Sequence, residues 1–156
     1  MAGARYAIPD EPSPGPMQRW AVDPFWPLFA QMLGGSWIAL PWFVFNGLAI
    51  GTATRRQEWM LAAASVAGSA LFVAALFAYA GQVAPDRTTL RLLMLPLLAL
   101  KLGIAYLLYL HQSRSFELWR HFGGAPRNGM VLVFLAALVR GTVLASLWMP
   151  LRLVLE

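Results

Sequence analysis

Two cationic residues, Lys101 and Arg140, are the side chains of this sequence whose types and positions could do chemistry. Each lies near the middle of a long apolar run, well away from the next polar stretch on either side. If these runs are membrane helices, each cation lies about 15 Å from water in both directions. A lysine or arginine at that depth costs about 2.5–3.5 kcal/mol on insertion scales. Both side chains therefore require compensation.

The sequence offers no acidic partner inside the same apolar runs. Glu58 and Asp86 lie at the ends of runs, and Glu117 lies between two of them. Four solutions remain open: hydrogen bonds to polar groups of the chain, a wet cavity, an anionic ligand or lipid headgroup, or acids of a partner protein. Snorkelling of each side chain with local thinning of the bilayer is the alternative that involves no function. Lys101 and Arg140 are thus the predicted anion or partner contacts.

The other reactive side chains predict no catalytic, metal or cofactor site. The chain has no cysteine, and its histidines, His111 and His121, share one polar stretch with Glu117. Two histidines without thiolates or paired carboxylates make a poor metal site. The sequence also lacks the phosphate-loop, nucleophile-elbow and zinc-protease motifs. We therefore expect no enzyme activity. A lipid-modifying enzyme that uses these three residues is the least favoured function.

Composition indicates a membrane protein. Of the 156 residues, 59% are hydrophobic and 12% are charged, and the mean hydropathy is +0.59. Soluble domains have about 45–50% apolar and about 25% charged residues, so this chain has too few charges to coat a water-facing surface. The net charge of +5 comes from residues between the apolar runs, which favours contact with phospholipid headgroups. Nucleic acid is not an expected partner.

Four apolar stretches reach the length of about 20 residues that a membrane helix needs. They cover residues 28–52, 59–80, 90–110 and 129–149. Tryptophans cluster near their ends, where the amphipathic indole ring is favoured. We therefore predict an all-α integral membrane protein, a four-transmembrane-helix bundle over residues 24–156. Residues 1–23, which are rich in proline, are predicted to form an irregular N-terminal tail.

The third loop, residues 111–128, has its own pattern. Phe116, Trp119 and Phe122 recur at three-residue spacing, with charged residues on the other faces. This spacing predicts a short amphipathic helix in the membrane interface. Gly123 and Gly124 are expected to end it.

Charge counting suggests an orientation. The first and third loops carry five arginines near the spans, against four on the other side. Basic residues favour the cytoplasmic face, so both termini of a four-span chain would lie on the same, non-cytoplasmic side. All basic residues but Lys101 are arginine, a bias common in GC-rich bacterial genomes. The expected location is the bacterial inner membrane.

Small residues at helical spacing mark predicted packing faces. In lipid, close backbone approach is a main source of helix association. The expected contact is with other helices of the same bundle, and a dimer seam is the alternative. The residues are Ala63, Ala67, Ala70, Ala74, Ala78 and Gly81 in the second span, Ala137, Gly141 and Ala145 in the fourth, and Gly34 and Gly35 in the first.

Two segments carry a resemblance. The segment LGGSWIALPWFVFNGLAIGTATRRQEW has a glycine pair, an asparagine, a further glycine and a basic turn, and HFGGAP precedes the last span. The residues are Gly34, Gly35, Asn46, Gly51, Arg55, Arg56 and 121–126. In these features the chain resembles a group of uncharacterised small bacterial inner-membrane proteins with four predicted helices. The resemblance implies the architecture and no activity.

The favoured function is a non-catalytic integral membrane subunit or scaffold that associates with other membrane proteins. A partner's acids would then satisfy Lys101 and Arg140. The alternative is a small homo-oligomeric transporter or channel for an anionic solute or lipid, in which the same two cations attract the anion. Expected partners are membrane lipids and either another membrane protein or further copies of the chain.

Overall fold

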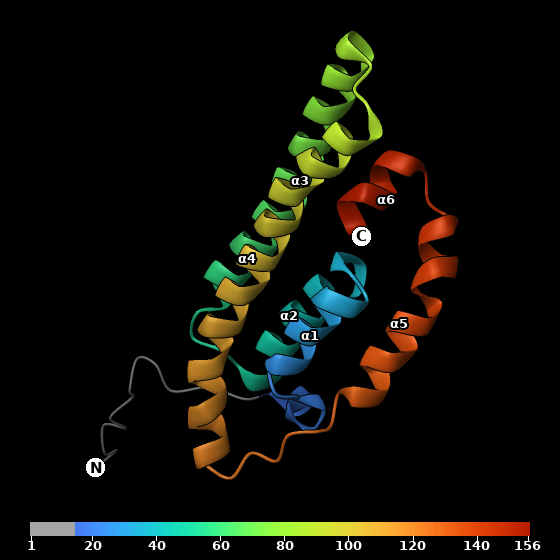
Figure 1. Cartoon of the computed structure of the whole chain (residues 1–156). Helices are drawn as coiled ribbons and strands as arrows, with labels where there is room; N and C mark the ends of the chain where they lie inside the picture. Colours follow the sequence, from blue (N-terminus) through green and yellow to red (C-terminus); the bar gives the residue numbers. More distant parts are fainter. Residues whose placement is uncertain (1–14) are drawn as a thin grey trace, which may run out of the picture.

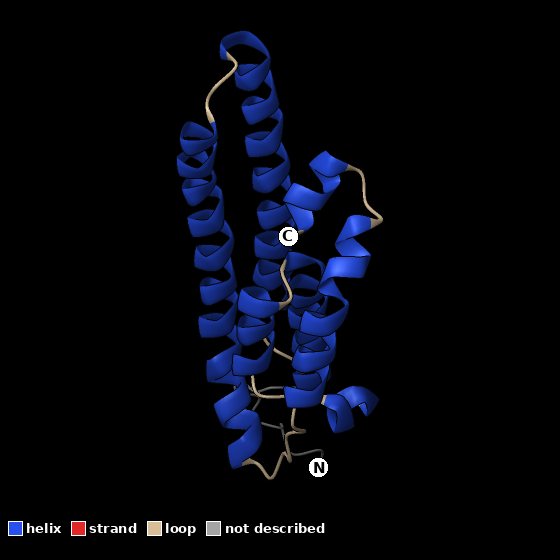
Figure 2. Cartoon of the chain, turned by 45° about the vertical axis from the view of Figure 1, so that its right-hand side comes forward, coloured by secondary structure: helices blue, strands red, loops and turns tan. Residues whose placement is uncertain are grey.

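The chain folds into helices throughout the part that the structure, a computed structural model, describes, residues 15–156. Six α-helices follow a short 3-10 helix, and no strand is formed in this part (Figures 1 and 2). Their bounds are η1 Pro16–Trp20, α1 Phe25–Leu33, α2 Ser36–Ile50, α3 Arg55–Val83, α4 Arg87–His121, α5 Met130–Ala145 and α6 Met149–Leu155. The all-α prediction is confirmed. Of the predicted N-terminal tail, residues 16–20 form η1, and residues 1–14 lie outside the described part.

α3 and α4 form a long antiparallel hairpin that extends beyond the other helices (Figure 1). With 29 and 35 residues, they are the two helices long and apolar enough to cross a membrane. A three-residue turn joins them, and its last residue, Asp86, caps α4 by accepting hydrogen bonds from the backbone N–H groups of Thr88 and Thr89. The Thr89 hydroxyl also donates to this carboxylate, and it is the main cause that lowers the pKa of Asp86.

The predicted first span is wrong, because residues 28–52 do not form one helix. The chain turns back at Gly34 and Gly35, so that α1 and α2 lie side by side as an antiparallel helical hairpin. Gly35 makes this two-residue connection possible with a φ of 97°, a conformation that favours glycine. The backbone N–H of Val22 donates to Asn46 Oδ1 at 2.9 Å. Both ends of the hairpin therefore lie at the same end of the molecule.

The predicted interfacial helix in the third loop is also wrong. Residues 111–121 continue α4 without a break. No proline or glycine interrupts the sequence between Gly103 and Gly123, so nothing separates a second helix from the first. Phe116 and Trp119, which were assigned to the interfacial helix, instead pack with Ala49 and Ile50 at the end of α2. Only residues 122–129 remain as the loop before α5.

Residues 129–149, the predicted fourth span, do not form one helix of that length. α5 ends at Ala145, and a separate helix, α6, follows with Pro150 in its first turn. α6 turns back between α5 and the α3–α4 hairpin (Figure 1). There Val154 packs in one cluster with Val73 of α3 and Leu97 of α4.

Three connecting segments gather at one end of the molecule, which we call the basic end. The backbone N–H of Arg127 donates to the carbonyl of Ala21 at 2.9 Å, and this bond places η1 beside the loop before α5. The loop between α2 and α3 lies at the same end (Figure 1). Its arginines are Arg19, Arg55, Arg56, Arg114, Arg120 and Arg127. The described N-terminal segment thus lies on the side of the first and third loops, not opposite to them as the four-span topology requires.

The small-residue stripe of α3 does not pack within the chain. Ala63, Ala67, Ala70, Ala74, Ala78 and Gly81 are all exposed, so the expected contact inside one bundle is wrong. The buried face of α3 is instead the one that carries Ser65, Ser69 and Val73. On α5, Ala137 is half-buried, Gly141 and Ala145 are exposed, and the packing residues are Val133, Ala136 and Leu144. Gly34 and Gly35 are buried.

Candidate anion-binding site

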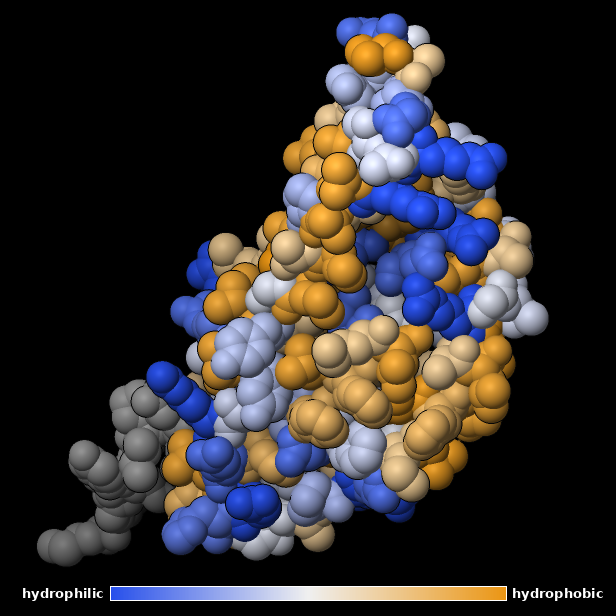
Figure 3. Space-filling model, viewed as in Figure 1, coloured by the Kyte–Doolittle hydropathy of each residue, from blue (hydrophilic) through white to orange (hydrophobic). Residues whose placement is uncertain are grey.

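Lys101 and Arg140 line the same pocket, although they belong to different helices. This central pocket has a volume of about 520 Å³ and lies between α1, α4, α5 and α6. Its walls are otherwise mostly apolar, with Met32, Leu98 and Leu153 among the lining residues. On the face seen in Figure 3, hydrophilic residues gather where α6 lies, within a largely apolar surface. The fold therefore unites the two cations that the sequence singled out.

Lys101 is held by the backbone of α6. Only 5% of the residue is exposed, and its Nζ donates to the carbonyl oxygen of Leu153 at 2.7 Å. An ammonium group has three N–H donors, and this is the one hydrogen bond that it makes with the described residues. The remaining donors are available to an acceptor in the pocket.

Arg140 is paired with an acid close to the end of α6. Its Nη2 lies 2.8 Å from Glu156 Oε1, and its Nη1 donates to the carbonyl of Leu33 at 3.2 Å. The other carboxylate oxygen of Glu156 lies 3.7 Å from Nε of Arg152. Glu156 is thus a counter-ion that the sequence did not predict, because it follows the last predicted span and no sequence pattern shows that it returns to Arg140. The Met149–Pro150 step is the one signal of a further helix, since proline is favoured in a first turn.

Interrupted helix ends meet beside these charges. The carbonyl that Arg140 contacts is that of Leu33, the last residue of α1. Gly35, just before α2, lies so close to the end of α6 that an added Cβ would come 2.5 Å from the carbonyl oxygen of Glu156. A side chain at this position would therefore displace α6. Irregular backbone at membrane depth is tolerated only where protein buries it or where it lines a cavity.

Gln31 adds a neutral polar group to the pocket. The residue is 6% exposed, and its Oε1 has no hydrogen-bond partner among the described residues. Its Nε2 donates to Ser36 Oγ at 3.0 Å. Rotation of the amide by half a turn would pair Oε1 with the Ser36 hydroxyl and direct the NH₂ group to the pocket. The ammonium of Lys101, the guanidinium of Arg140 and this amide bring N–H donors to the pocket beside a single carboxylate side chain, and such donors suit a carboxylate or phosphate ligand.

A separate set of buried polar residues connects α2, α3 and α4, and we call it the polar core. Gln112 Nε2 donates to Glu58 Oε2 at 2.8 Å and to the Phe43 carbonyl at 2.6 Å, and Asn46 Nδ2 donates to Gln112 Oε1 at 3.3 Å. Thr54 Oγ1 donates to the second oxygen of Glu58. Glu58, which the sequence placed at a span end, is 1% exposed. All of these groups satisfy one another, which indicates a structural role.

His111 and His121 make separate contacts in the last part of the chain's fourth α-helix. His111 Nδ1 lies 2.8 Å from the carbonyl of Leu107, one turn earlier in the same helix. His121 packs edge-on against Phe122. Within residues 15–156, no group of three or more histidine, aspartate or glutamate residues could hold a metal ion.

No protein-family model, curated protein or solved structure matches this chain. The resemblance to small four-helix inner-membrane proteins therefore stays a prediction, and function has to be argued from the geometry of the site.

Proposed function

We propose that this protein is an integral membrane protein that binds an anionic solute or lipid headgroup in the central pocket and carries it through the membrane. One observation supports this proposal most strongly: the end of α1, the end of α6 and both cations converge on a single pocket. Membrane transporters build their substrate sites in this way, from discontinuous helices near the middle of the bilayer. The convergence favours this function over the scaffold.

The proposed membrane arrangement has α3 and α4 as complete spans. α5, with 16 residues, is about 24 Å long and crosses most of the hydrocarbon core. α6 then returns towards the middle. The α1–α2 hairpin enters from the basic end and turns back at Gly34–Gly35. The 15 residues of α2 lead from this turn back to the basic end, so the turn lies at a depth of about 22 Å. It is a re-entrant element in place of the predicted first span.

The basic end is proposed to face the cytoplasm. It carries the arginines of η1, of the start of α3, of the end of α4 and of the loop before α5, whereas Arg87 and Arg91 lie in the first turns of α4, at the opposite end. Because the described N-terminal segment lies on the arginine-rich side, the two sides differ in arginine number by more than the sequence count suggested. The positive-inside rule then places this segment on the cytoplasmic side, opposite to the side predicted from the sequence.

Single-cysteine labelling tests this orientation. The chain has no cysteine, so Met17→Cys, Ala53→Cys, Ala84→Cys and Ala125→Cys each introduce the sole thiol. In intact cells, a membrane-impermeant maleimide is expected to label only Ala84→Cys, and permeabilised cells should show labelling of all four. Labelling of Met17→Cys and Ala84→Cys from the same side would contradict the arrangement.

The function itself is tested by removing the cations. Lys101→Leu and Arg140→Leu are expected to insert normally, because each removes a charge that is costly in lipid. We expect the wild-type protein to retain an anionic molecule during purification in mild detergent, and each cation variant to lose it, as measured by native mass spectrometry. Leu138→Ala is the matched control, since Leu138 is 78% exposed on α5. Unchanged co-purification in both cation variants would refute an anion site.

The scaffold remains the second candidate, and one observation favours it. The alanine stripe of α3 is exposed over its whole length, and small residues allow a partner helix to approach closely. A stoichiometric second membrane protein in the same purification would support the scaffold, whereas a bound anion with no second protein would support the transport function.

A further inference from the structure

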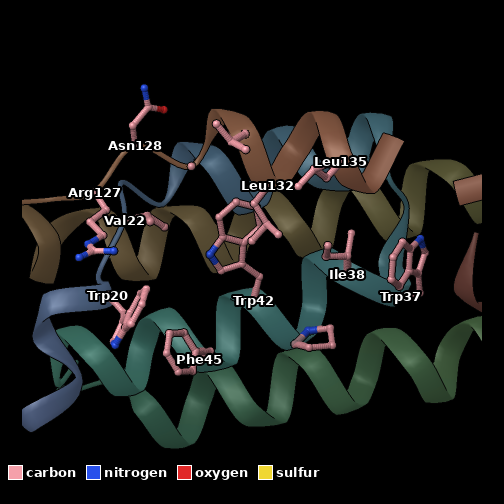
Figure 4. A pocket seen from close by; sticks show the side chains of 13 residues that line it. Trp20, Val22, Trp37, Ile38, Trp42, Phe45, Arg127, Asn128, Leu132 and Leu135 are labelled. Carbon is pink, nitrogen blue, oxygen red and sulfur yellow. The ribbon is translucent and has the colours of Figure 1, made fainter. Parts of the chain in front are cut away.

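A second pocket lies between α2 and α5, close to the basic end (Figure 4). We call it the aromatic groove. Its volume of about 690 Å³ falls in the range of about 300–1,000 Å³ typical of ligand sites. Trp37, Ile38 and Pro41 of α2 line one wall, and Leu132 and Leu135 of α5 line the other. These residues make the body of the groove apolar.

The mouth of the groove, in contrast, carries hydrogen-bond donors. The guanidinium of Arg127 lies 4.4 Å from the centroid of the Trp20 ring. Asn128 Oδ1 accepts from the backbone N–H of Met130 at 2.9 Å, so the side-chain NH₂ is the group of Asn128 that is left for a ligand. α5 also begins here, and the positive end of its helix dipole favours an anion.

Trp42 contributes a further donor from inside the groove. The residue is 8% exposed, and its indole N–H makes no hydrogen bond with another residue in the range 15–156. In Figure 4 its ring nitrogen lies on the side that faces Arg127 and Trp20. An indole nitrogen can only donate. The nitrogen is not among the fully enclosed polar atoms that lack a partner, so an acceptor of a ligand in the groove can reach this N–H.

The mouth is held in place before any ligand binds. The backbone N–H of Arg127 donates to Ala21, and the N–H of Val22 donates to Asn46. At Gly129, an added Cβ would come 2.6 Å from Cγ of Trp26 and 3.0 Å from Cη2 of Trp42. This close approach places the start of α5 directly on α1 and α2, which fixes the spacing of the two walls.

We infer that the aromatic groove binds an anionic phospholipid. The phosphate lies between Arg127, Asn128 and the Trp42 indole, and one acyl chain follows Ile38, Pro41 and Leu135. From Phe45 to Trp37, the α2 wall is about 12 Å long, which accommodates the upper part of an acyl chain. Charge complementarity argues for an anionic lipid, because Arg127 lines the mouth, the lining includes no acidic side chain, and further arginines belong to the same end of the molecule.

The experiment is a native mass spectrometry titration of the full chain in detergent. The probes are dioleoyl-phosphatidylglycerol, dioleoyl-phosphatidylcholine and soluble glycerol phosphate. We expect the wild-type protein to prefer phosphatidylglycerol over phosphatidylcholine. Arg127→Gln should weaken phosphatidylglycerol binding about fivefold, the effect of one basic residue near a membrane surface, and Arg127→Lys should restore most of it. Leu135→Trp, which fills the apolar part, should weaken the binding of both lipids.

Arg120→Gln is the matched control. Arg120 belongs to the same end of the molecule but lies over the Phe116 ring and does not line the groove, so its loss should leave binding unchanged. Equal effects of Arg127→Gln and Arg120→Gln would overturn the inference, because they would indicate a general surface charge effect. Displacement of the lipid by an equal concentration of glycerol phosphate would also overturn it, since the site would then be one for free phosphate.

Discussion

Replacing Gln112 by leucine is expected to lower the free energy of unfolding by about 3 kcal/mol. The side chain is fully buried and donates to both Glu58 and the Phe43 carbonyl. Leucine preserves the volume but leaves these acceptors and the Asn46 amide without their partner. Each unsatisfied buried polar group costs about 1–3 kcal/mol. The measurement is reversible unfolding of the purified protein in mixed micelles with increasing denaturing detergent.

Two variants make this result specific to the polar core. Glu117→Leu changes an exposed polar residue of the same helix and should shift stability by no more than about 0.5 kcal/mol. The double variant Glu58→Leu with Gln112→Leu should recover part of the loss, because removing both partners leaves fewer unsatisfied groups. If Gln112→Leu were as mild as Glu117→Leu, the polar core would not hold α2, α3 and α4 together.

Hydropathy could predict the long helices but not the reversal of the chain. α3 and α4 contain the expected second and third spans and extend beyond both ends of them, since their apolar runs are long and have no strong breaker near the middle except Pro96. The α1–α2 hairpin was missed because its connection is only Gly34 and Gly35. Such a short turn leaves the apolar run uninterrupted, and a hydropathy average carries no information on direction.

The candidate site could be predicted in part for a similar reason. Lys101 and Arg140 stand out because charge is rare and costly at membrane depth, and that signal belongs to single residues. Glu156 and Gln31 give no such signal. Glu156 becomes a partner of Arg140 only because α6 folds back, and Gln31 reaches the pocket only because α1 ends beside it. Both depend on tertiary contacts that periodicity does not contain.

Removing the acid and removing the arginine of the central pocket are expected to change its affinity for an anion in opposite directions. The Glu156 carboxylate partly neutralises the charge of Arg140, as a bound anion would. Glu156→Gln keeps a hydrogen-bonding oxygen for Arg140 and removes the competing charge. We therefore expect an added anion to bind about tenfold more tightly to Glu156→Gln and about tenfold more weakly to Arg140→Gln than to the wild-type protein.

Calorimetric titration with dodecyl phosphate, in a neutral maltoside detergent, measures whether the central pocket binds an anion. All three proteins carry Arg127→Gln, so that any binding to the aromatic groove is weakened and is the same in each of them. If an anion binds beside Arg140 and Glu156, the protein with Glu156→Gln should bind dodecyl phosphate most tightly. The protein with Arg127→Gln alone should bind it less tightly, and the protein with Arg140→Gln should bind it most weakly. Equal affinities in all three proteins, or weaker binding after Glu156→Gln, would contradict the presence of an anion site in the central pocket.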